Sequence, residues 1–229
     1  MISNLFVFRH AETTDNSNNI FSGWRNPDLT PKGLLQAQEV AQQLEKEKID
    51  YAFTSHLMRT KRTLEIVLKP HPKVPIVIDD RLIERCYGAL QGKSKTEIAA
   101  EKPEWYAKVH RSYNFPPPEG ESLKMVESRT LPFVVQLKGW LQKKPSNVAI
   151  SCHGNSMRPI RRIFEHLSLK QMLQLENPQD HAMEYALHIH RVNVDEVEER
   201  RLENGWHSVV VPSSVTLATD QRNPLKQYY

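Results

Sequence analysis

Short apolar runs alternate with amphipathic helical patterns over the first two-thirds of this 229-residue chain. A buried strand is typically a run of about four to eight apolar residues bounded by turn signals. Four segments fit this pattern, at residues 5–8, 51–55, 74–78 and 147–151. Helical spacing of apolar residues occurs over residues 31–46, 58–68, 95–100, 104–110, 122–141 and 156–166. This alternation predicts a three-layer α/β/α fold with a mainly parallel central sheet.

Turn and helix-breaking residues indicate where these elements begin and end. Thr30 offers a side-chain cap and Pro31 suits the first helical position, so we expect a helix to begin there. The segment 13–19 is rich in Asn, Ser and Thr, and is predicted to be an irregular loop. Pro132 is expected to kink or interrupt the long helix, because proline removes one backbone hydrogen bond.

The length favours a single domain over residues 1–229, in which residues 191–229 form a C-terminal extension. Two more strands are expected at residues 182–194 and 206–211, with Asn204-Gly205 as the signal of a hairpin turn. The extension either closes over a ligand site or pads the edge of the sheet. Padding is the favoured interpretation, because an ordinary strand pattern occupies its middle.

The composition excludes several classes of protein. Hydrophobic residues make up 39% of the chain and charged residues 25%, as is typical of globular proteins. No apolar run approaches the length of a membrane span and no signal peptide is evident, so we expect a cytoplasmic protein without membrane contact. The net charge of +4 comes without a dense basic run. It therefore does not imply nucleic acid, and it suits a small anionic substrate.

The two cysteines, Cys86 and Cys152, lie far apart in the sequence and show no metal-ligand spacing. We therefore expect reduced thiols and no metal site.

Arg9 and His10 directly follow the first apolar run. In open α/β sheets ligands bind beyond the carboxyl ends of the strands, which is where these two residues are predicted to lie. A guanidinium group matches the geometry of a phosphoryl group, and an imidazole can act as a nucleophile near neutral pH. The pair suggests phosphoryl transfer through a phosphohistidine. A strand end that carries two polar residues by chance is the alternative.

Three further segments place polar groups in comparable positions. Arg59 lies in the first turns of a helix that follows a strand, His153 ends another strand, and Glu84 stands in a polar segment. Each segment alone carries little weight. Together they supply the nucleophile, the cations and the proton donor that in-line phosphoryl transfer requires. Clustered cations would replace the usual magnesium ion.

Several longer strings occur in the same order as in a known family. They are Arg9-His10-Ala11, Phe21-Ser22-Gly23-Trp24, Leu29-Thr30-Pro31-Lys32-Gly33, the string from Glu84 to Gly92, His153-Gly154-Asn155-Ser156 and Glu176-Asn177-Pro178. Over roughly residues 3 to 190 the chain resembles the histidine phosphatase superfamily, and within it the cofactor-dependent phosphoglycerate mutase branch. The corresponding family strings include Arg-His-Gly, Phe-Thr-Gly-Trp and His-Gly-Asn-Ser.

The resemblance implies an isomerase that interconverts 3-phosphoglycerate and 2-phosphoglycerate, primed by 2,3-bisphosphoglycerate and without a metal. It implies that His10 is the phosphorylated nucleophile and Glu84 the general acid and base. Arg9, Arg59 and His153 are the expected holders of the transferred phosphoryl group. The expected substrate contacts are Asn16, Ser22, Gly23, Arg85, Tyr87, Lys95, His110, Arg111 and Asn155. Dimerisation is common in the family, so the resemblance leaves open whether this chain forms a homodimer.

Three departures from the family pattern bear on the choice of substrate. Ala11 replaces a glycine, which is strained if its φ is positive and harmless otherwise. His110 replaces an arginine and contributes a full charge only when protonated. The family's bulkier insert between the Pro-rich loop and the long helix is absent here. A site that admits more water favours a phosphomonoesterase that uses the same His10 chemistry. A binding protein that has lost turnover is a third hypothesis.

Overall fold

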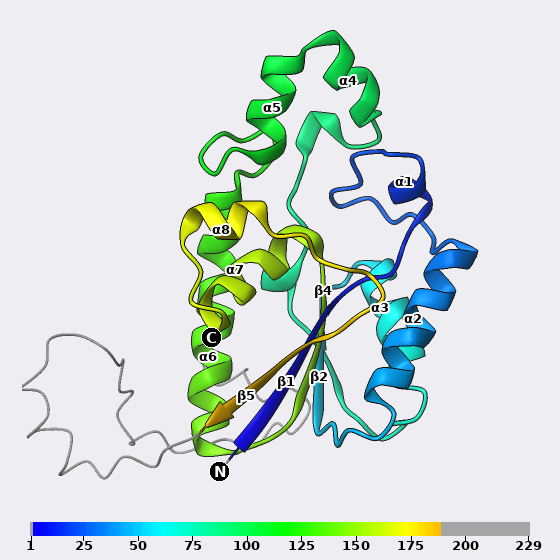
Figure 1. Cartoon of the computed structure of the whole chain (residues 1–229), viewed down its shortest axis with the longest axis vertical. Coiled ribbons are helices and arrows are strands. Elements are labelled where there is room, and N and C mark those ends of the chain that lie inside the picture. The colour runs from blue at the N-terminus through cyan, green and yellow to red at the C-terminus, as the bar shows by residue number, and fades with distance from the viewer. Residues whose placement is uncertain (1, 189–229) are drawn as a thin grey trace, which may run out of the picture.

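A computed structural model describes residues 2–188 of the chain, and a five-stranded sheet lies at its centre (Figure 1). The strands are β1 (Ile2–Arg9), β2 (Tyr51–Thr54), β3 (Ile76–Ile78), β4 (Val148–Cys152) and β5 (Met183–His188). Their order across the sheet is β3-β2-β4-β1-β5. The first four strands are mutually parallel, whereas β5 runs antiparallel to β1.

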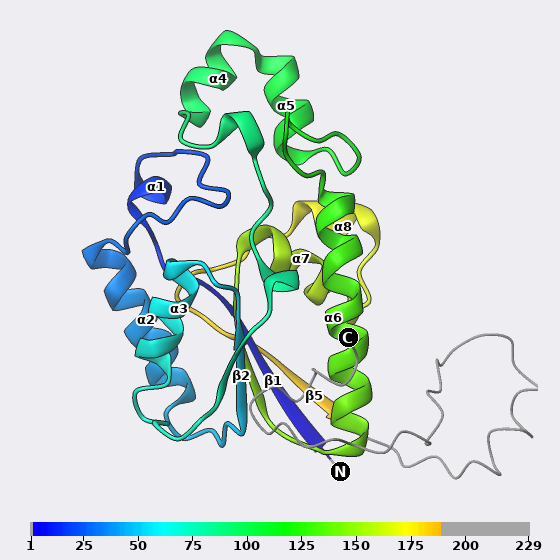
Figure 2. The same ribbon diagram turned by 180° about the vertical axis from the view of Figure 1, so that it is seen from behind.

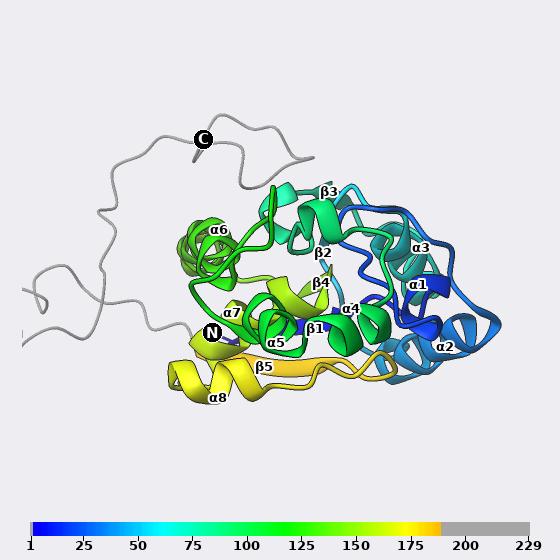
Figure 3. The ribbon, with the colours of Figure 1, turned by 90° about the horizontal axis from the view of Figure 1, so that it is seen from above.

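Helices cover both faces of this sheet, as the view from above shows (Figure 3). The covering helices are α2 (Pro31–Leu44), α3 (Met58–Val67), α6 (Leu123–Lys143) and α7 (Gly154–Phe164). Phe6 and Phe8 of β1 pack with α2 and α3, while Leu5 and Val7 pack with α6 and α7. The division follows from the alternation of side chains along a strand. Within residues 2–188, no helix is both long and apolar enough to cross a membrane.

A small cap lies beyond the carboxyl ends of the parallel strands (Figures 1 and 2). It contains α4 (Lys95–Glu101) and α5 (Pro103–Arg111), and residues 112–121, here called the cap loop, lead from it to α6. Val109 of α5 joins Phe21, Tyr87 and Leu90 in an apolar cluster that is separate from the two clusters packed on the sheet. This cluster packs the cap against the segments around Phe21 and Tyr87, over the edge of the sheet where polar residues were predicted to gather.

The predicted three-layer α/β/α fold with a mainly parallel sheet is confirmed. The strand predicted at 74–78 begins at Ile76, and the helix predicted at 156–166 begins at Gly154. The second difference arises because the extended backbone of His153 caps the helix immediately after β4. The segment predicted as strand at 182–194 contains β5 in its described part. The strand at 206–211, the hairpin turn and the C-terminal extension lie outside the described residues.

The prediction of an irregular loop at residues 13–19 was wrong. A short helix, α1 (Thr14–Ser17), occupies part of it, and Thr13 and Asn16 cap it reciprocally through their side chains. The polar residues that suggested irregular structure therefore stabilise a helix start.

Two other local features differ from expectation. α6 is not interrupted at Pro132, because buried residues such as Phe133 and Leu137 hold the helix against the sheet beyond that point. A further short helix, α8 (Leu169–Gln174), was not predicted, although Ser168 and Gln171 form a capping box at its start. Two single-turn 3₁₀ helices, Asp80–Leu82 and Gly88–Leu90, were likewise not predicted.

Gly33 lets the first turn of α2 approach the chain just beyond β1. A Cβ atom at this position would lie 2.1 Å from the carbonyl oxygen of Glu12. That oxygen also accepts a hydrogen bond from the Thr30 amide at 3.0 Å, so it cannot withdraw freely. The contact joins α2 to the backbone two residues after His10.

We predict that Gly33→Ala lowers the free energy of unfolding, although alanine is the better helix former by about 1 kcal/mol. The steric conflict with Glu12 outweighs the gain in propensity. Gly139→Ala is the matched control, because a Cβ at this position of α6 meets nothing within 4 Å and should stabilise the protein. Urea denaturation of the two variants measures both effects. Changes of the same sign would contradict the prediction.

Candidate active site

His10 and His153 lie side by side at the carboxyl edge of the sheet. The parallel register pairs Arg9 with Cys152, and the His10 amide then donates to the Cys152 carbonyl oxygen at 2.9 Å. His153 directly follows Cys152, which brings the two imidazole rings edge to face with their centroids 5.2 Å apart. The pairing of two strands that are distant in sequence therefore creates the centre of the site.

The hydrogen bonds of His10 define which ring nitrogen carries the proton. Nδ1 lies 2.8 Å from the carbonyl oxygen of Ala11, which can only accept, and Nε2 accepts from the Arg59 Nε–H at 3.1 Å. Burial, Arg59 and Arg9 together hold the pKa of His10 well below its usual value. Near neutral pH the ring is therefore neutral, and the lone pair that a nucleophile needs resides on Nε2.

Two buried arginines flank this nucleophile. Arg59 comes from the first turn of α3, and backbone carbonyl oxygens of Gly23 and Arg25 each accept a hydrogen bond from it at 2.8 Å. Burial lowers the pKa of Arg59 to about 10, so its guanidinium stays charged at neutral pH. Arg9 is less engaged: its buried Nε has no hydrogen-bond partner among the described residues. Arg9 can therefore donate to an incoming anion.

A chain of hydroxyl groups orients His153. The Thr60 hydroxyl donates its proton to the Leu57 carbonyl oxygen at 2.9 Å, so Thr60 must accept from the Ser55 hydroxyl. Because the Ser55 proton is used in that bond, the Ser55 oxygen accepts from His153 Nε2–H at 2.8 Å. The remaining nitrogen, Nδ1, is buried without a hydrogen-bond partner among the described residues. Burial and the charge of Arg59 hold the pKa of His153 well below its usual value. A bound phosphate dianion would oppose this shift and favour the form that donates from Nδ1.

The Glu84 carboxylate is held by two backbone amides. Oε1 accepts from the amides of Arg85 at 2.7 Å and Asn155 at 3.2 Å. Asn155 stands in the first turn of α7, so the helix start contributes to the binding of this carboxylate. Both hydrogen bonds from the described residues fall on Oε1, which leaves Oε2 to carry a transferable proton.

His10, the two arginines and Glu84 line a cavity of about 210 Å³. Its lining includes most of the residues singled out in the sequence: Arg9, His10, Asn16, Ser22, Gly23, Arg59, Glu84, Tyr87, Lys95, His110 and Asn155. His153, which was predicted to hold the phosphoryl group, is fully buried and is not part of this lining. The described structure adds five lining residues that the sequence interpretation did not include: Ile20, Gly154, Arg158, Glu176 and Asn177.

All of the added residues except Ile20 had a signal in the sequence, since Gly154, Glu176 and Asn177 belong to strings already noted. Arg158 follows Gly154 by four positions in α7, and residues at this spacing share one face of a helix. The Asn177 carbonyl oxygen accepts from Arg9 at 3.4 Å, and its side-chain amide donates to the Gly154 carbonyl oxygen at 2.7 Å.

Arg85 does not line the cavity, although the sequence interpretation made it a substrate contact. Its fully buried guanidinium donates to the backbone carbonyl oxygens of Glu121 at 2.6 Å, His110 at 3.2 Å and Phe115 at 3.3 Å. Arg85 therefore fastens the cap loop to the segment that carries Glu84. Of Arg111, only the backbone is described, at the end of α5.

The charges of the cavity favour an anion. Four arginine and lysine side chains in the described lining face two carboxylates, Glu84 and Glu176. Ligand atoms of His10, Glu84 and His153 lie within 4.8 Å of one another, a spacing that could hold a metal ion. The buried guanidinium groups beside them would repel such a cation and attract a phosphoryl group. The donor set therefore fits a phosphate better than a metal.

Ala11 is accommodated without backbone strain. Its φ is not positive, its side chain is buried, and its amide donates to the Thr63 hydroxyl at 3.0 Å. Of the two outcomes considered for the replacement of the family glycine, the harmless one applies.

Comparisons with known proteins agree with this geometry. A model of the histidine phosphatase superfamily (branch 1) matches residues 5–198. A 2,3-bisphosphoglycerate-dependent phosphoglycerate mutase from Nitrobacter winogradskyi is 38% identical over 177 residues, which cover 75% of this chain and 86% of the relative. The chain therefore belongs to the histidine phosphatase superfamily, and the resemblance inferred from its strings is confirmed.

Two solved structures share the fold of this chain. Bacillus stearothermophilus YhfR matches with a TM-score of 0.68 and 26% identity, covering 76% of this chain and 86% of its own. The alpha-ribazole phosphatase from Shigella flexneri matches with a TM-score of 0.71 and 23% identity, over 82% of this chain and 91% of its own. The second likeness establishes the fold alone.

We predict that His10 remains neutral, with its proton on Nδ1, at pH values down to well below 6.5. The pKa of His10 is lowered because burial and two guanidinium groups disfavour the imidazolium form. Nitrogen-15 chemical shifts of the histidine rings across a pH titration measure the state of each nitrogen, and the His10→Asn variant identifies the resonances. Protonation of both His10 nitrogens near pH 6.5 would contradict the prediction.

Proposed function

We propose that the protein is a phosphoglycerate mutase that interconverts 3-phosphoglycerate and 2-phosphoglycerate through a phosphohistidine at His10. The observation that carries this proposal is an unprotonated Nε2 on His10, flanked by two buried guanidinium groups in a cavity that also contains Glu84. Relatives at 34% to 38% identity bear the name of 2,3-bisphosphoglycerate-dependent phosphoglycerate mutases, which supports the choice of reaction.

In the proposed transfer, Nε2 of His10 attacks the phosphorus atom in line with the departing oxygen. Arg9, Arg59 and the protonated form of His153 offset the charge on the equatorial oxygens. Glu84 donates a proton to the leaving oxygen as the phosphorus–oxygen bond breaks. In the return transfer the carboxylate removes a proton from the hydroxyl group that takes the phosphoryl group.

The rest of the cavity suits the second anionic end of a small substrate. Lys95 reaches the lining from the start of α4, and burial together with the charge of Arg9 lowers its pKa. The Ser22 hydroxyl is buried and has no hydrogen-bond partner among the described residues, so it can donate to a ligand. A cavity of about 210 Å³ is smaller than the roughly 300–1,000 Å³ of sites for drug-sized ligands. This size favours a phosphorylated three-carbon acid.

The proposed primer is 2,3-bisphosphoglycerate, which would phosphorylate His10 before the first cycle. Its two phosphate groups would occupy the His10 end and the Lys95 end of the cavity. No metal is needed in this scheme, because the guanidinium groups supply the positive charge.

We predict that the purified protein converts 3-phosphoglycerate to 2-phosphoglycerate, and that 2,3-bisphosphoglycerate raises the rate. A coupled assay for 2-phosphoglycerate, with inorganic phosphate measured in parallel, follows both fates of the phosphoryl group. The His10→Ala variant, checked for folding by circular dichroism, should be inactive. Steady phosphate release without 2-phosphoglycerate stimulated by the cofactor would overturn the mutase proposal.

That outcome would favour a second candidate, a phosphomonoesterase in which water attacks the phosphohistidine. One observation supports it. His110, which lines the cavity, stands at the position of a family arginine and stacks on Tyr106 with ring centroids 4.9 Å apart. Because a histidine replaces an arginine, the cavity has one permanent charge fewer for a glycerate substrate.

We predict that Glu84→Gln slows phosphoryl transfer by about 10²–10⁴-fold, the usual range for loss of a general acid or base. The amide keeps an oxygen that can accept from the two backbone amides but cannot supply the proton. Glu97→Gln, on the exposed side of the cap, is the matched control and should leave the rate unchanged. A near-normal rate for Glu84→Gln would remove this residue from its proposed role.

A further inference from the structure

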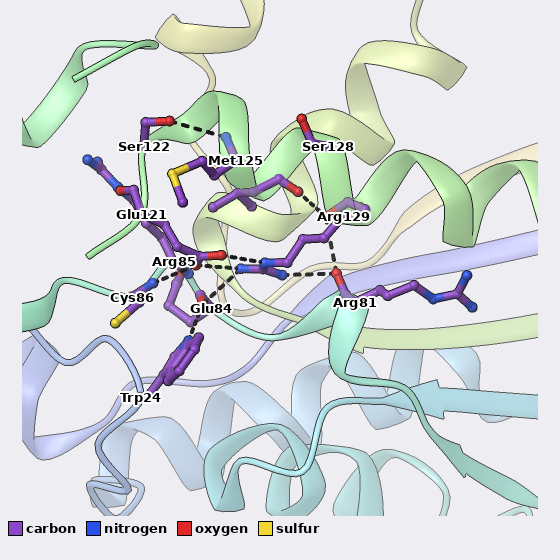
Figure 4. Close-up of polar contacts among 12 residues, drawn as sticks. Trp24, Arg81, Glu84, Arg85, Cys86, Glu121, Ser122, Met125, Ser128 and Arg129 are labelled. Carbon is purple, nitrogen blue, oxygen red and sulfur yellow. Dashed lines mark hydrogen bonds and ion pairs between the residues drawn. The ribbon is translucent and has the colours of Figure 1, made fainter. Parts of the chain in front are cut away.

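Arg129, on α6, lies outside the cavity and yet contacts the backbone that carries Glu84 (Figure 4). Its guanidinium donates to the carbonyl oxygens of Arg81 and Glu84, both at 3.0 Å. The same group forms a two-pronged ion pair with the Glu121 carboxylate, at 2.9 and 3.0 Å. The side chains of Arg129 and Glu121 are only 20% and 14% exposed, so solvent screens this pair weakly.

Glu121 holds the other side of the same segment. Its Oε2 accepts from the Cys86 amide at 2.8 Å, and its own amide donates to the Cys86 carbonyl oxygen at 2.9 Å. The ion pair therefore holds the backbone both at and just beyond Glu84. A second donor reaches the Glu84 carbonyl oxygen from the opposite side, the indole Nε1–H of Trp24, at 2.7 Å.

These backbone contacts bear directly on the Glu84 side chain. The carbonyl group of Glu84 and the amide group of Arg85 belong to one peptide unit, which is planar and rotates as a whole. Arg129 and Trp24 hold the carbonyl end of this unit. The amide end donates to Oε1 of the Glu84 carboxylate. The orientation of that peptide unit thus sets the orientation of the carboxylate in the cavity.

We propose that Arg129 and Glu121 are positioning residues that hold the Glu84 carboxyl group in place for proton transfer. This inference rests on the acid role given to Glu84 in the proposed function. Arg85 connects these contacts to the cap loop, since it donates to the Glu121 carbonyl oxygen at 2.6 Å. The cap loop and the acid are therefore held by one connected set of contacts.

The leaving group of the phosphate donor separates this role from a merely structural one. Phenyl phosphate has a poor leaving group that needs a proton from Glu84, whereas 2,4-dinitrophenyl phosphate releases a stable anion that needs none. In both cases the bond from phosphorus to the aryl oxygen breaks as the bond to Nε2 of His10 forms. A misplaced acid slows only the first reaction, but a damaged phosphate site slows both.

The experiment measures phosphorylation of His10 by each donor in a single turnover, by rapid quench. Arg129→Lys keeps the charge, but lysine cannot present the planar fork that spans these acceptors. We expect about tenfold or greater slowing with phenyl phosphate, the scale that a small misplacement of a catalytic group can produce. With 2,4-dinitrophenyl phosphate we expect less than about threefold slowing. Glu84→Gln should show the same pattern with a larger effect.

Arg162→Lys is the matched control. Arg162 forms a comparable ion pair with Glu127 of α6, at 2.7 Å, and none of its hydrogen bonds from the described residues reaches residues 81–86. It should slow neither donor selectively. Equal slowing of both donors by Arg129→Lys, or slowing of neither, would overturn the proposal.

Two further variants keep the test decisive if Arg129→Lys folds poorly. Glu121→Gln removes the negative charge that pairs with Arg129. Trp24→Phe removes the second donor to the Glu84 carbonyl oxygen, and the Trp24 residue is 46% exposed, so this change disturbs little of the core. Each should slow phenyl phosphate more than the dinitrophenyl ester, and equal effects on both donors would count against the proposal. The readout is independent of mutase turnover, because a wild-type protein that fails to interconvert phosphoglycerates would still show the leaving-group pattern.

Discussion

The parallel pairing of β1 with β4 is the constraint on which the rest of the site depends. β1 is buried from Leu5 to Phe8 and β4 over its whole length, and each strand is followed at once by a histidine. Because Arg9 pairs in register with Cys152, His10 and His153 emerge side by side. A slip of one residue would exchange the faces of every side chain on the strand. The apolar packing that stabilises the sheet therefore also aligns the nucleophile.

Buried positive charge is the second organising feature. A buried guanidinium is costly unless hydrogen bonds replace its water, and Arg59 obtains them from the carbonyl oxygens of Gly23 and Arg25. Arg9 keeps an unsatisfied donor, and the cations of the described lining outnumber its carboxylates. A phosphoryl group would complete both the hydrogen bonding and the charge. The same cations disfavour protonation of His10, so the arrangement that attracts the phosphate also keeps the nucleophile neutral.

Much of this arrangement could be predicted from local patterns. Apolar runs of strand length and the cap at Thr30 located the main elements, and polar residues at strand ends located the histidines. Features that depend on several interactions at once were missed. The polar segment after β1 forms α1 because Thr13 and Asn16 cap each other, and α6 continues past Pro132 because its buried face is held by the sheet. Neither competition between interactions is visible in residue type alone.

The sequence by itself determined the order of the main strands and helices along the chain, the family, and the residue types available at the carboxyl edge of the sheet. These follow from hydrophobic periodicity and from polar strings that are contiguous in the chain. Only the tertiary structure decided which polar groups meet: that Arg85 fastens the cap loop, and that Arg129 reaches the carbonyl oxygen of Glu84. That last contact spans 45 positions of the chain. Partners so distant are selected by the packing of whole helices and strands, which leaves no periodic pattern around either residue.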